Sequence, residues 1–309
     1  MLRNISFVLA LALSAAQIAQ GAQAKNQSTQ AHASTQKATA SKAQKQIEDA
    51  SALLLSFNSG DTSIAQKLLS PHYKQHNQHY KDGAEALISA IPEMKGTQTT
   101  IHRAFSDGDY VVLHSEVRLP SGESSVAFDI FRFKNGKIVE HWDNIAAKTS
   151  ANSSGRTQID GRASIDSKVK SAESRKIAQD FVNNVLLQGR TKELTRFIGT
   201  QYIQHNSAIA DGLDGLGAAL DSMAKNGVIM RYHKIHKVLA SGDFALVVSE
   251  GELGRIGEVP EGALAGKSGA PAVAFYDLFR VEKGKIVEHW DIIEPLLSHA
   301  ENGNGKFGF

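Results

Sequence analysis

The sequence contains the same eight residues twice: GKIVEHWD occupies residues 136–143 and again residues 284–291. Three further pairs of segments recur in the same order: YKQHN (73–77) with YIQHN (202–206), IHRAF (101–105) with IHKVL (235–239), and DIFRF (129–133) with DLFRV (277–281). Self-similarity at a roughly fixed spacing indicates a repeated structural unit. The chain is therefore predicted to contain two copies of one domain.

The ends of the chain and the region between the copies have a different composition. Residues 1–24 have the form of a secretory signal peptide, with a positive start, an apolar run at 5–16 and Ala-Gln-Ala before Lys25. A retained membrane anchor is the alternative, although the run is shorter than the roughly 20 apolar residues that span a bilayer. The predicted organisation is a signal peptide at 1–24, a flexible tether at 25–41, a first domain at 42–147, a linker at 148–170, a second domain at 171–297 and a flexible tail at 298–309.

Charge and cysteine content exclude several classes of function. Lys and Arg number 34 against 32 Asp and Glu, and no long basic run is present, so a nucleic-acid partner is not expected. The 309 residues include no cysteine, which excludes disulfides and cysteine-ligated metal sites. With export, the expected location is secreted or periplasmic, and no membrane span is expected in the mature chain.

Each copy has helical patterns first and strand patterns last. In the second copy, residues 175–189 and 191–199 have helical periodicity, the YIQHN segment follows, and residues 215–227 form a further expected helix. β-rich runs separated by Gly-containing turns complete the copy. This order predicts an α+β fold in which one curved antiparallel sheet wraps around its helices and leaves a conical cavity.

The recurring motifs resemble the SnoaL-like family of the nuclear transport factor 2-like superfamily. The resemblance rests on Tyr-x-x-His-Asn followed by Asp-Gly, on the Asp-x-Phe-Arg strand and on GKIVEHWD, and it covers roughly residues 44–147 and 173–296. It implies two tandem cone-shaped α+β barrels, each with a pocket between its helices and the concave face of its sheet. Relatives include polyketide cyclases, ketosteroid isomerase and limonene epoxide hydrolase, beside members that only bind. Fold does not fix function, so the resemblance leaves the chemistry open.

Strand alternation identifies one candidate base in each copy. Asp277 shares a strand face with Phe275 and Phe279, and Asp129 has an equivalent place in the first copy. A carboxyl group between aromatic rings is desolvated, which raises its pKa and suits it to proton transfer. The alternative is a structural Asp that pairs with a nearby His or with the backbone.

Four further histidines are candidates for acid–base work because the ordinary pKa of His lies near neutrality. His76 and His205 come just before a helix, and each is interpreted either as a general base or as a histidine with a structural partner. His102 and His236 lie on the following strand, where His236 is a candidate relay partner of Asp277. The adjacent Asn77 and Asn206 bind substrate or cap the turn.

The closing strand of each copy leaves an alternative open. His289 and Asp291 share a face and Trp290 lies on the other, so the strand supplies either acid–base groups or an aromatic wall to the cavity. The candidate acid–base residues are His76, His102, Asp129, His141, His205, His236, Asp277 and His289. The candidate substrate contacts are Asn77, Trp142, Asn206, Phe275, Phe279 and Trp290.

Two classes of function remain. In the first, each cone binds a small, partly apolar molecule and performs acid–base chemistry next to a carbonyl, as an aldol-type condensation, cyclisation or isomerisation. In the second, the tandem domains bind a small molecule without changing it. A cluster of His205, His236, Asp277 and His289 could bind a metal, but its spacing matches no metal motif, so neither metal nor organic cofactor is expected. The two domains are expected to form an intramolecular pseudo-dimer.

The second copy carries an insertion between Gly251 and Pro271. Its Gly-, Ala- and Pro-rich sequence is interpreted either as a lid over the cone or as a tolerated surface loop.

Overall fold

The computed structural model describes residues 37–309 and comprises two units, residues 1–45 and 46–309. The predicted signal peptide and most of the predicted tether lie outside the described residues. The last tether residues, 37–41, are helical, as is the rest of the first unit up to residue 45. Everything below concerns the second unit.

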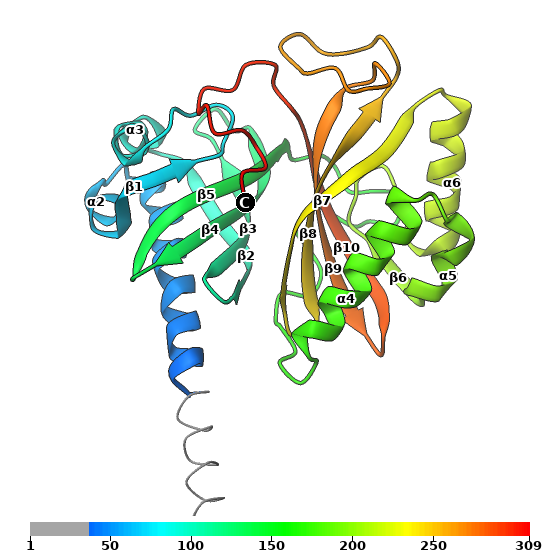
Figure 1. Ribbon diagram of the computed structural model, residues 1–309, viewed down its shortest axis with the longest axis horizontal. Coiled ribbons are helices and arrows are strands. Elements are labelled where there is room, and N and C mark those ends of the chain that lie inside the picture. The colour runs from blue at the N-terminus through cyan, green and yellow to red at the C-terminus, as the bar shows by residue number, and fades with distance from the viewer. Residues whose placement is uncertain (1–36) are drawn as a thin grey trace, which may run out of the picture. The chain divides into compact units, whose positions relative to one another are not determined.

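The first copy begins with helical residues 46–59 and continues as a series of short helices and strands (Figure 1). Its elements are α2 (Ser63–Leu68), β1 (Leu69–Gln75), α3 (Ala84–Ala90), η1 (Ile91–Met94), β2 (Gln98–Asp107), β3 (Tyr110–Arg118), β4 (Ser124–Lys134) and β5 (Lys137–Ala147). The sheet has the strand order β1-β5-β4-β3-β2.

The second copy repeats this arrangement. Its elements are α4 (Ser171–Phe181), η2 (Val182–Leu187), η3 (Thr191–Glu193), α5 (Leu194–Phe197), β6 (Ile198–Gln204), α6 (Gly212–Lys225), β7 (Ile229–Ser241), β8 (Phe244–Gly254), β9 (Ala272–Glu282) and β10 (Lys285–Pro295). The order β6-β10-β9-β8-β7 matches that of the first sheet. The predicted duplication and α+β class are confirmed.

The sheets differ from the expected ones in one strand each. β1 pairs in parallel with β5, and β6 pairs in parallel with β10, whereas all other neighbouring strands are antiparallel. The sheets are therefore mixed rather than wholly antiparallel. β1 and β6 end at the glutamine of the Tyr-x-Gln-His-Asn segments, so the Tyr and Gln belong to the sheet and the His and Asn follow directly after the strand.

The glycine of each GKIVEHWD octet closes a two-residue hairpin. Asn135 and Gly136 join β4 to β5 with φ of 53° and 75°, and Lys283 and Gly284 join β9 to β10 with φ of 50° and 74°. Two consecutive positive φ angles fit the type I′ turn, whose twist matches that of the flanking strands. This turn sets the register that pairs Asp129 with Asp143, and Asp277 with Asp291.

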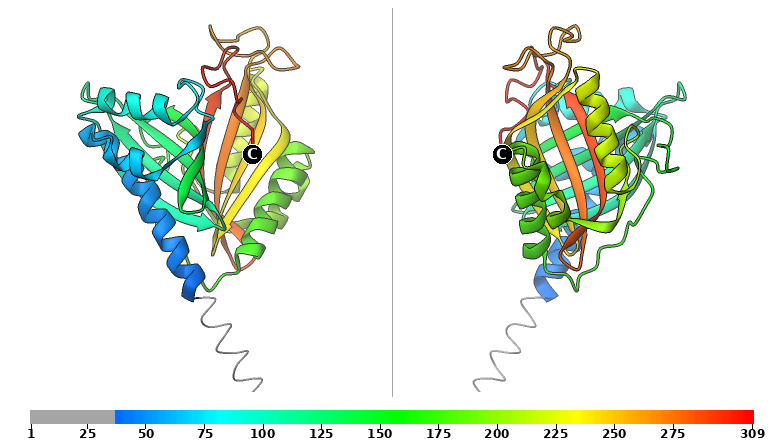
Figure 2. Two further views of the ribbon diagram at one scale, coloured as in Figure 1. Left: turned by 60° about the vertical axis from the view of Figure 1, so that its left-hand side comes forward. Right: turned by 90° about the vertical axis from the view of Figure 1, so that its right-hand side faces the viewer.

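The two faces of each sheet are buried in different ways. One face packs against the helices of its own copy, and Figure 2 shows α4 and α6 lying over the second sheet. The opposite faces contribute to a single apolar cluster that contains Trp142 and Phe128 from the first copy and Trp290 and Tyr276 from the second. Within this cluster, Asn144 donates hydrogen bonds to the carbonyls of Ala274 (3.0 Å) and Ile292 (2.7 Å). The two copies are thus joined through the backs of their sheets.

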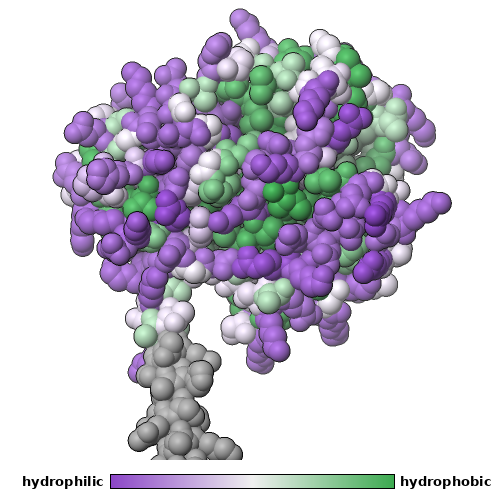
Figure 3. All heavy atoms as spheres, viewed as in Figure 1, coloured by the Kyte–Doolittle hydropathy of each residue, from purple (hydrophilic) through white to green (hydrophobic). Residues whose placement is uncertain are grey.

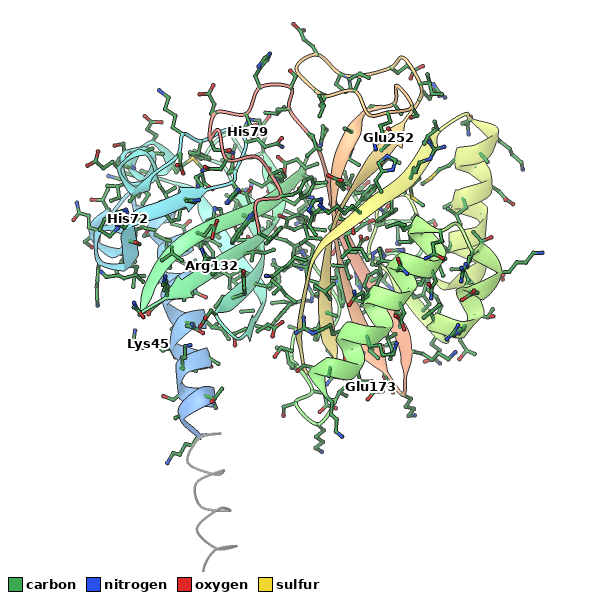
Figure 4. The ribbon with its side chains drawn as sticks, in the orientation of Figure 1. Lys45, His72, His79, Arg132, Glu173 and Glu252 are labelled. Atoms are coloured by element: carbon green, nitrogen blue, oxygen red, sulfur yellow. The ribbon has the colours of Figure 1, made fainter. Side chains whose placement is uncertain are left out.

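The insertion of the second copy is fastened to its sheet. Glu252, labelled in Figure 4 on β8, is fully buried and accepts hydrogen bonds from the backbone N–H (2.9 Å) and hydroxyl (2.6 Å) of Ser268. A side chain at Gly266 would bring a Cβ atom within 2.2 Å of the Glu252 carboxylate. No insertion residue is among the described residues that line the second cavity, which favours the surface-loop interpretation over the lid.

Two segments outside the predicted domains are packed. Asn152, in the predicted linker, is 6% exposed, and Asn302 and Lys306, in the predicted flexible tail, are each 5% exposed. The expectation of a flexible tail is therefore wrong, because its polar side chains bind backbone and carboxylate groups of the first copy and the Glu294 carboxylate of the second. Hydrophilic residues predominate on the face shown in Figure 3, with hydrophobic residues between them. Among residues 37–309, no helix has the length and apolar character to cross a membrane.

Candidate functional site

The helix-facing side of the first sheet encloses a cavity of about 230 Å³. Most of its wall is apolar and comes from helical residues such as Leu53, Phe57 and Leu87 and from strand residues such as Val117 and Phe131. Five polar residues of the wall are connected by short contacts, Gln75 and Asp129 through His141, and Asn77 with Asp143. An apolar cavity with a few convergent polar groups is the usual form of a small-molecule site.

His141 is held between a carboxylate and an amide. Its Nε2 lies 3.1 Å from Asp129 Oδ1, and its Nδ1 lies 2.9 Å from Gln75 Oε1. Strand pairing produces this arrangement, because Asp129 on β4 and His141 on β5 lie on the same face and Gln75 ends the parallel strand β1. The first copy thus brings together two of the predicted acid–base residues, Asp129 and His141.

The orientation of Gln75 decides which nitrogen of His141 carries hydrogen. Gln75 Oε1 accepts hydrogen bonds from the backbone N–H groups of His76 (3.0 Å) and Asn77 (2.9 Å), and its amide nitrogen donates to the Tyr73 hydroxyl (3.1 Å). Gln75 Oε1 is therefore an acceptor, and His141 Nδ1 must donate to it. The contact between Nε2 and Asp129 Oδ1 then needs one proton, carried by either the imidazole or the carboxyl group. Asp129 and His141 therefore share a proton.

Asp129 has the character of a base that is short of partners. Burial raises its pKa, although the hydrogen bond and charge of His141 oppose that shift. The residue is 5% exposed, and its Oδ2 has no hydrogen-bond partner of good geometry among residues 37–309, while the side chain of Ser115 also opposes the rise in pKa. A buried carboxylate oxygen without a partner is costly, so this atom is prepared to receive a proton from a bound molecule.

The second cone repeats the arrangement. His289 Nε2 lies 3.0 Å from Asp277 Oδ1 and its Nδ1 lies 3.1 Å from Gln204 Oε1, which accepts the backbone N–H of Asn206 at 2.9 Å. Burial lowers the pKa of His289, but the hydrogen bond to Asp277 and the charges of Asp291 and Asp277 outweigh it, so the pKa is raised. Burial also raises the pKa of Asp291.

Tyr232 distinguishes the second cone from the first. Its hydroxyl lies 3.3 Å from both carboxylate oxygens of Asp277, and its ring stacks on Phe275 at 4.0 Å. The first copy has Thr99 at this register position, opposite Val117, where the second copy has Gly251. A Cβ atom at Gly251 would lie 2.0 Å from the Arg231 carbonyl oxygen and 2.8 Å from the Phe275 ring, so the glycine makes room for the neighbouring backbone and for the aromatic pair. The second cavity is smaller, about 180 Å³, and its Asp277 already has a donor.

The raised pKa of His289 predicts a pH-dependent contribution to stability. The folded protein holds this proton more tightly than the unfolded chain, in which the pKa is about 6.5. The stabilisation is therefore complete below that pH and is lost as the pH rises through the folded pKa. We expect the free energy of unfolding, measured in urea between pH 5.5 and 8.5, to fall more steeply with pH in the unsubstituted protein than in His289→Gln. Parallel pH profiles would contradict this expectation.

Two predicted bases lie on the wrong face of the sheet. His76 and His205 point away from the cavities and stack on Trp142 (4.8 Å) and Trp290 (4.5 Å). His76 Nε2 lies 3.1 Å from Glu140, which also binds Arg132 on β4 (Figure 4), and His205 Nε2 lies 3.0 Å from Glu288. The predictions for His76 and His205 as bases are wrong, because both rings pack on the tryptophans of the cluster between the sheets and bind glutamates there.

The tryptophans and the other two histidines also lie outside the cavities. Trp142 and Trp290 belong to the cluster between the two sheets, so they are not substrate contacts. His102 and His236 follow Ile101 and Ile235, which pack against the cone cores, and therefore point outward to Glu116 (3.9 Å) and Glu250 (3.1 Å). Burial lowers the pKa of both histidines. Their predicted roles are wrong for the same reason of facing.

The remaining predicted contacts lie close to the acid–base groups. Asn77 donates to Asp143 Oδ2, and Asn206 donates to both carboxylate oxygens of Asp291 at 2.9 and 2.8 Å. Phe279 stacks on His289 at 4.7 Å, and Phe275 stacks on Tyr232. Gln75 and Gln204 are not among the residues predicted from the sequence, although the Tyr-x-Gln-His-Asn segment has glutamine at its third position in both copies. That recurrence was the available signal.

Two triads have a geometry that suits a cation. Asp129, His141 and Asp143, and likewise Asp277, His289 and Asp291, offer ligand atoms that lie within 4.8 Å of one another, and no other group in the described part does so. However, Lys306 Nζ lies 3.6 Å from Asp143 Oδ1, and Asn206 occupies both oxygens of Asp291. Protein donors already bind these carboxylates, which favours proton transfer over metal binding.

Comparison with known families assigns the fold. The model of the SnoaL-like domain matches residues 50–141 and again residues 178–289, which together make up more than half of the chain. The chain belongs to the SnoaL-like domain family. The two matches correspond to the two copies, and both aspartate–histidine pairs of this SnoaL-like protein lie within the matched ranges. No curated protein matched by sequence.

Solved structures similar to this SnoaL-like protein each match about one copy. TsrD from Streptomyces laurentii is 23% identical, with 32% of this chain and 88% of that chain covered and a TM-score of 0.28. An LEH-like epoxide hydrolase from M. tuberculosis is 17% identical, with 34% of this chain and 85% of that chain covered and a TM-score of 0.31. A putative polyketide cyclase from Bacillus cereus ATCC 10987 is 18% identical, covers 33% and 74%, and has a TM-score of 0.31.

Proposed function

We propose that the first cone binds a small, partly apolar carbonyl compound and removes a proton from the carbon next to the carbonyl, without an organic cofactor. The observation that carries this proposal is the unpaired oxygen of Asp129. Its Oδ2 is buried in a mostly apolar cavity, and burial raises the pKa of the carboxyl group. A base whose pKa is raised towards the working pH is effective in general acid–base catalysis.

The proposed proton transfer takes place between the bound carbonyl compound and Asp129 alone. Asp129 Oδ2 forms a bond to the proton, the electron pair of the broken C–H bond becomes the C=C bond of an enolate, and the carbonyl electrons move onto oxygen. Return of the proton to the same carbon reverses the step. In a β,γ-unsaturated ketone the enolate is a dienolate, and return of the proton to its γ-carbon gives the conjugated isomer. Attack of the enolate carbon on a second carbonyl forms a C–C bond, and the protonated Asp129 then gives its proton to the alkoxide of the aldol product. His141, fixed by Gln75, stabilises the carboxylate form of Asp129 from the other oxygen.

Binding without turnover is the alternative, and the second cone favours it there. Tyr232 already donates to Asp277, and the aromatic pair with Phe275 reduces the cavity. The Tyr232 hydroxyl thus already lies against the carboxylate oxygens that would receive a proton. We therefore assign proton transfer to the first cone and binding to the second.

Exchange of α-protons for deuterium tests the proposal directly. 2-Tetralone is a compact aromatic ketone with two acidic CH₂ groups, and proton NMR in D₂O follows the loss of their signals. We expect the protein to accelerate exchange over the buffer rate. A saturable rise in melting temperature with 2-tetralone but no acceleration at any pH would show that the protein only binds the ketone.

We also propose that the chain is exported and that the fused copies act as a pseudo-dimer. Export is supported by the form of residues 1–24, and mass spectrometry of the protein from the extracellular or periplasmic fraction should give an N-terminus at Lys25. The pseudo-dimer is supported by the apolar cluster to which both sheets contribute. Light scattering should then give the mass of one chain, and a stable mass of two chains would contradict it.

A further inference from the structure

We infer that residues 298–309, which follow the second copy, position the acid–base groups of the first cone. We call these residues the C-terminal clasp. The inference rests on the site described for the proposed function, but its contacts stand independently of the reaction. It makes the first cone dependent on a segment about 160 residues further along the chain than His141.

The clasp binds the segment that orients His141. Asn304 donates to the carbonyl of Gln75 (3.0 Å), and Asn302 donates to the carbonyl of Asn77 (2.7 Å). Between them, His76 Nδ1 lies 2.7 Å from the carbonyl of Gly305. All three contacts fall on residues 75–77, whose side chains Gln75 and Asn77 hold His141 and Asp143.

Lys306 of the clasp carries a charge to the edge of the site. Its side chain is 3% exposed, and Nζ lies 2.5 Å from Glu294 Oε2 and 3.6 Å from Asp143 Oδ1. The other oxygen of Asp143 accepts from Asn77. Removing a buried ammonium would leave two buried carboxylates, one from each copy, without compensation. Lys306 and Asn77 together therefore fix Asp143 on the wall of the cavity.

Two phenylalanines anchor the clasp. Phe309 stacks on Trp142 at 4.5 Å, and Phe307 stacks on His236 at 4.2 Å. One ring thus contacts the first copy and the other contacts the second. Trp142 and His236, which face away from the cavities, thus provide the rings on which the clasp packs.

The linker makes the same kind of contact with the second copy. Asn152 donates to the carbonyl of Gln204 (2.8 Å), and His205 Nδ1 lies 2.8 Å from the carbonyl of Thr157. Each copy is therefore bound, at its Tyr-x-Gln-His-Asn segment, by the segment that follows the other copy. The linker and the clasp differ in sequence but bind the same segment of the two copies. This recurrence indicates that the contact belongs to the duplicated fold and is not a chance packing of one terminus.

The two clasping segments differ in their charge contact. Lys306 reaches Asp143 in the first cone, whereas Arg156 of the linker binds Asp211 at 3.1 Å, near the start of α6. Among the described residues, a cation therefore contacts Asp143 in the first cone, whereas the clasping cation of the second cone contacts Asp211 rather than Asp291.

The tautomer of His141 provides a readout that needs no ligand. Ring ¹⁵N shifts separate protonated from unprotonated nitrogens, and the signals of His141 and His289 are assigned from His141→Gln and His289→Gln. We expect deletion of 298–309, and the double variant Asn304→Ala with Lys306→Met, to move the His141 signals towards a mixture of tautomers and leave those of His289 unchanged. Exchange of 2-tetralone should fall by about ten- to hundredfold, the scale of small misplacements of catalytic groups.

Controls separate positioning from general destabilisation. Lys306→Arg keeps the positive charge, so its His141 signals should match those of the unsubstituted protein. Lys267→Met removes a lysine from the exposed insertion and should leave the His141 signals unchanged. If the deletion variant does not fold, the double variant decides. Unchanged His141 signals in a folded variant would overturn the inference, as would equal changes at His141 and His289. Absence of exchange in the unsubstituted protein would contradict the proposed function alone, because the NMR comparison does not use the ketone.

Discussion

Replacing Asp129 with Asn is expected to slow α-proton exchange of 2-tetralone by about 10²–10⁴-fold, the usual contribution of a general base. The amide has the shape of the carboxyl group but cannot accept a proton from carbon. Affinity for the ketone, measured by calorimetry, should change little because the apolar wall of the cavity is unaltered. The rate is measured by NMR at ketone concentrations that saturate the protein.

Asp277→Asn is the matched control for this substitution. It makes the same change in the second cone, where Tyr232 already donates to the carboxylate. Because proton transfer is assigned to the first cone, we expect the exchange rate to stay within about twofold of the unsubstituted rate. A roughly twofold change corresponds to less than about 1 kcal/mol of activation free energy. Equal losses in both variants would show that both cones react, and a loss in Asp277→Asn alone would reverse the assignment.

Trp290→Ala should have the largest effect on stability, lowering the free energy of unfolding by about 3–5 kcal/mol. Trp290 is 1% exposed, stacks on His205, lies under the Arg103 guanidinium at 4.1 Å and donates from Nε1 to the carbonyl of Asp160 at 2.9 Å. Removing the indole leaves a cavity between the sheets and an unpaired carbonyl. Urea unfolding measures the change.

The same variant tests the corrected position of the tryptophan. Because Trp290 faces away from both cavities, 2-tetralone should still bind to the folded variant with nearly unchanged affinity. Ile256→Ala, at a side chain that is 64% exposed, should change the stability by no more than about 0.5 kcal/mol. Retained stability with lost binding in Trp290→Ala would place the indole in the ligand site after all.

The repeat allowed much of this fold to be predicted. Two copies of each motif showed which residues belong together, and alternation around Asp129 and Asp277 correctly placed both carboxyl groups on the cavity side. The closing strand could be reduced to two possible facings, of which the structure has the one with His141 and His289 inward. Periodicity is informative for these residues because they lie on long, regular strands.

The facing of β1 and β6 could not be read from the sequence. Seven-residue strands give little periodicity, and their parallel partners β5 and β10 follow about 65 to 90 residues later. The sequence therefore suggested His76 and His205 as acid–base residues, whereas the histidines that line the cavities, His141 and His289, lie on the neighbouring strands. Gln75 was not predicted. Chemistry that depends on orientation by an amide has no signature in residue type alone.

The packed linker and clasp were unpredictable for a different reason. Their Gly-, Ser- and Asn-rich composition is typical of flexible segments, which bury little apolar surface. Here Asn152 and Asn302 instead bind backbone carbonyls at the ends of β6 and β1, and two phenylalanines stack on rings of the folded domains. Such order comes from the partner surface rather than from the segment itself.

The pH dependence of exchange in Asp277→Asn tests the central claim most directly, because only the first cone then retains the aspartate that is paired with a histidine. The carboxylate form of Asp129 is the base, and burial raises its pKa. The rate, corrected for buffer, should therefore rise with pH at a midpoint above the ordinary aspartate value of about 3.9. A midpoint at or below that value, or saturable binding with no exchange at any pH, would contradict an acid–base site at Asp129.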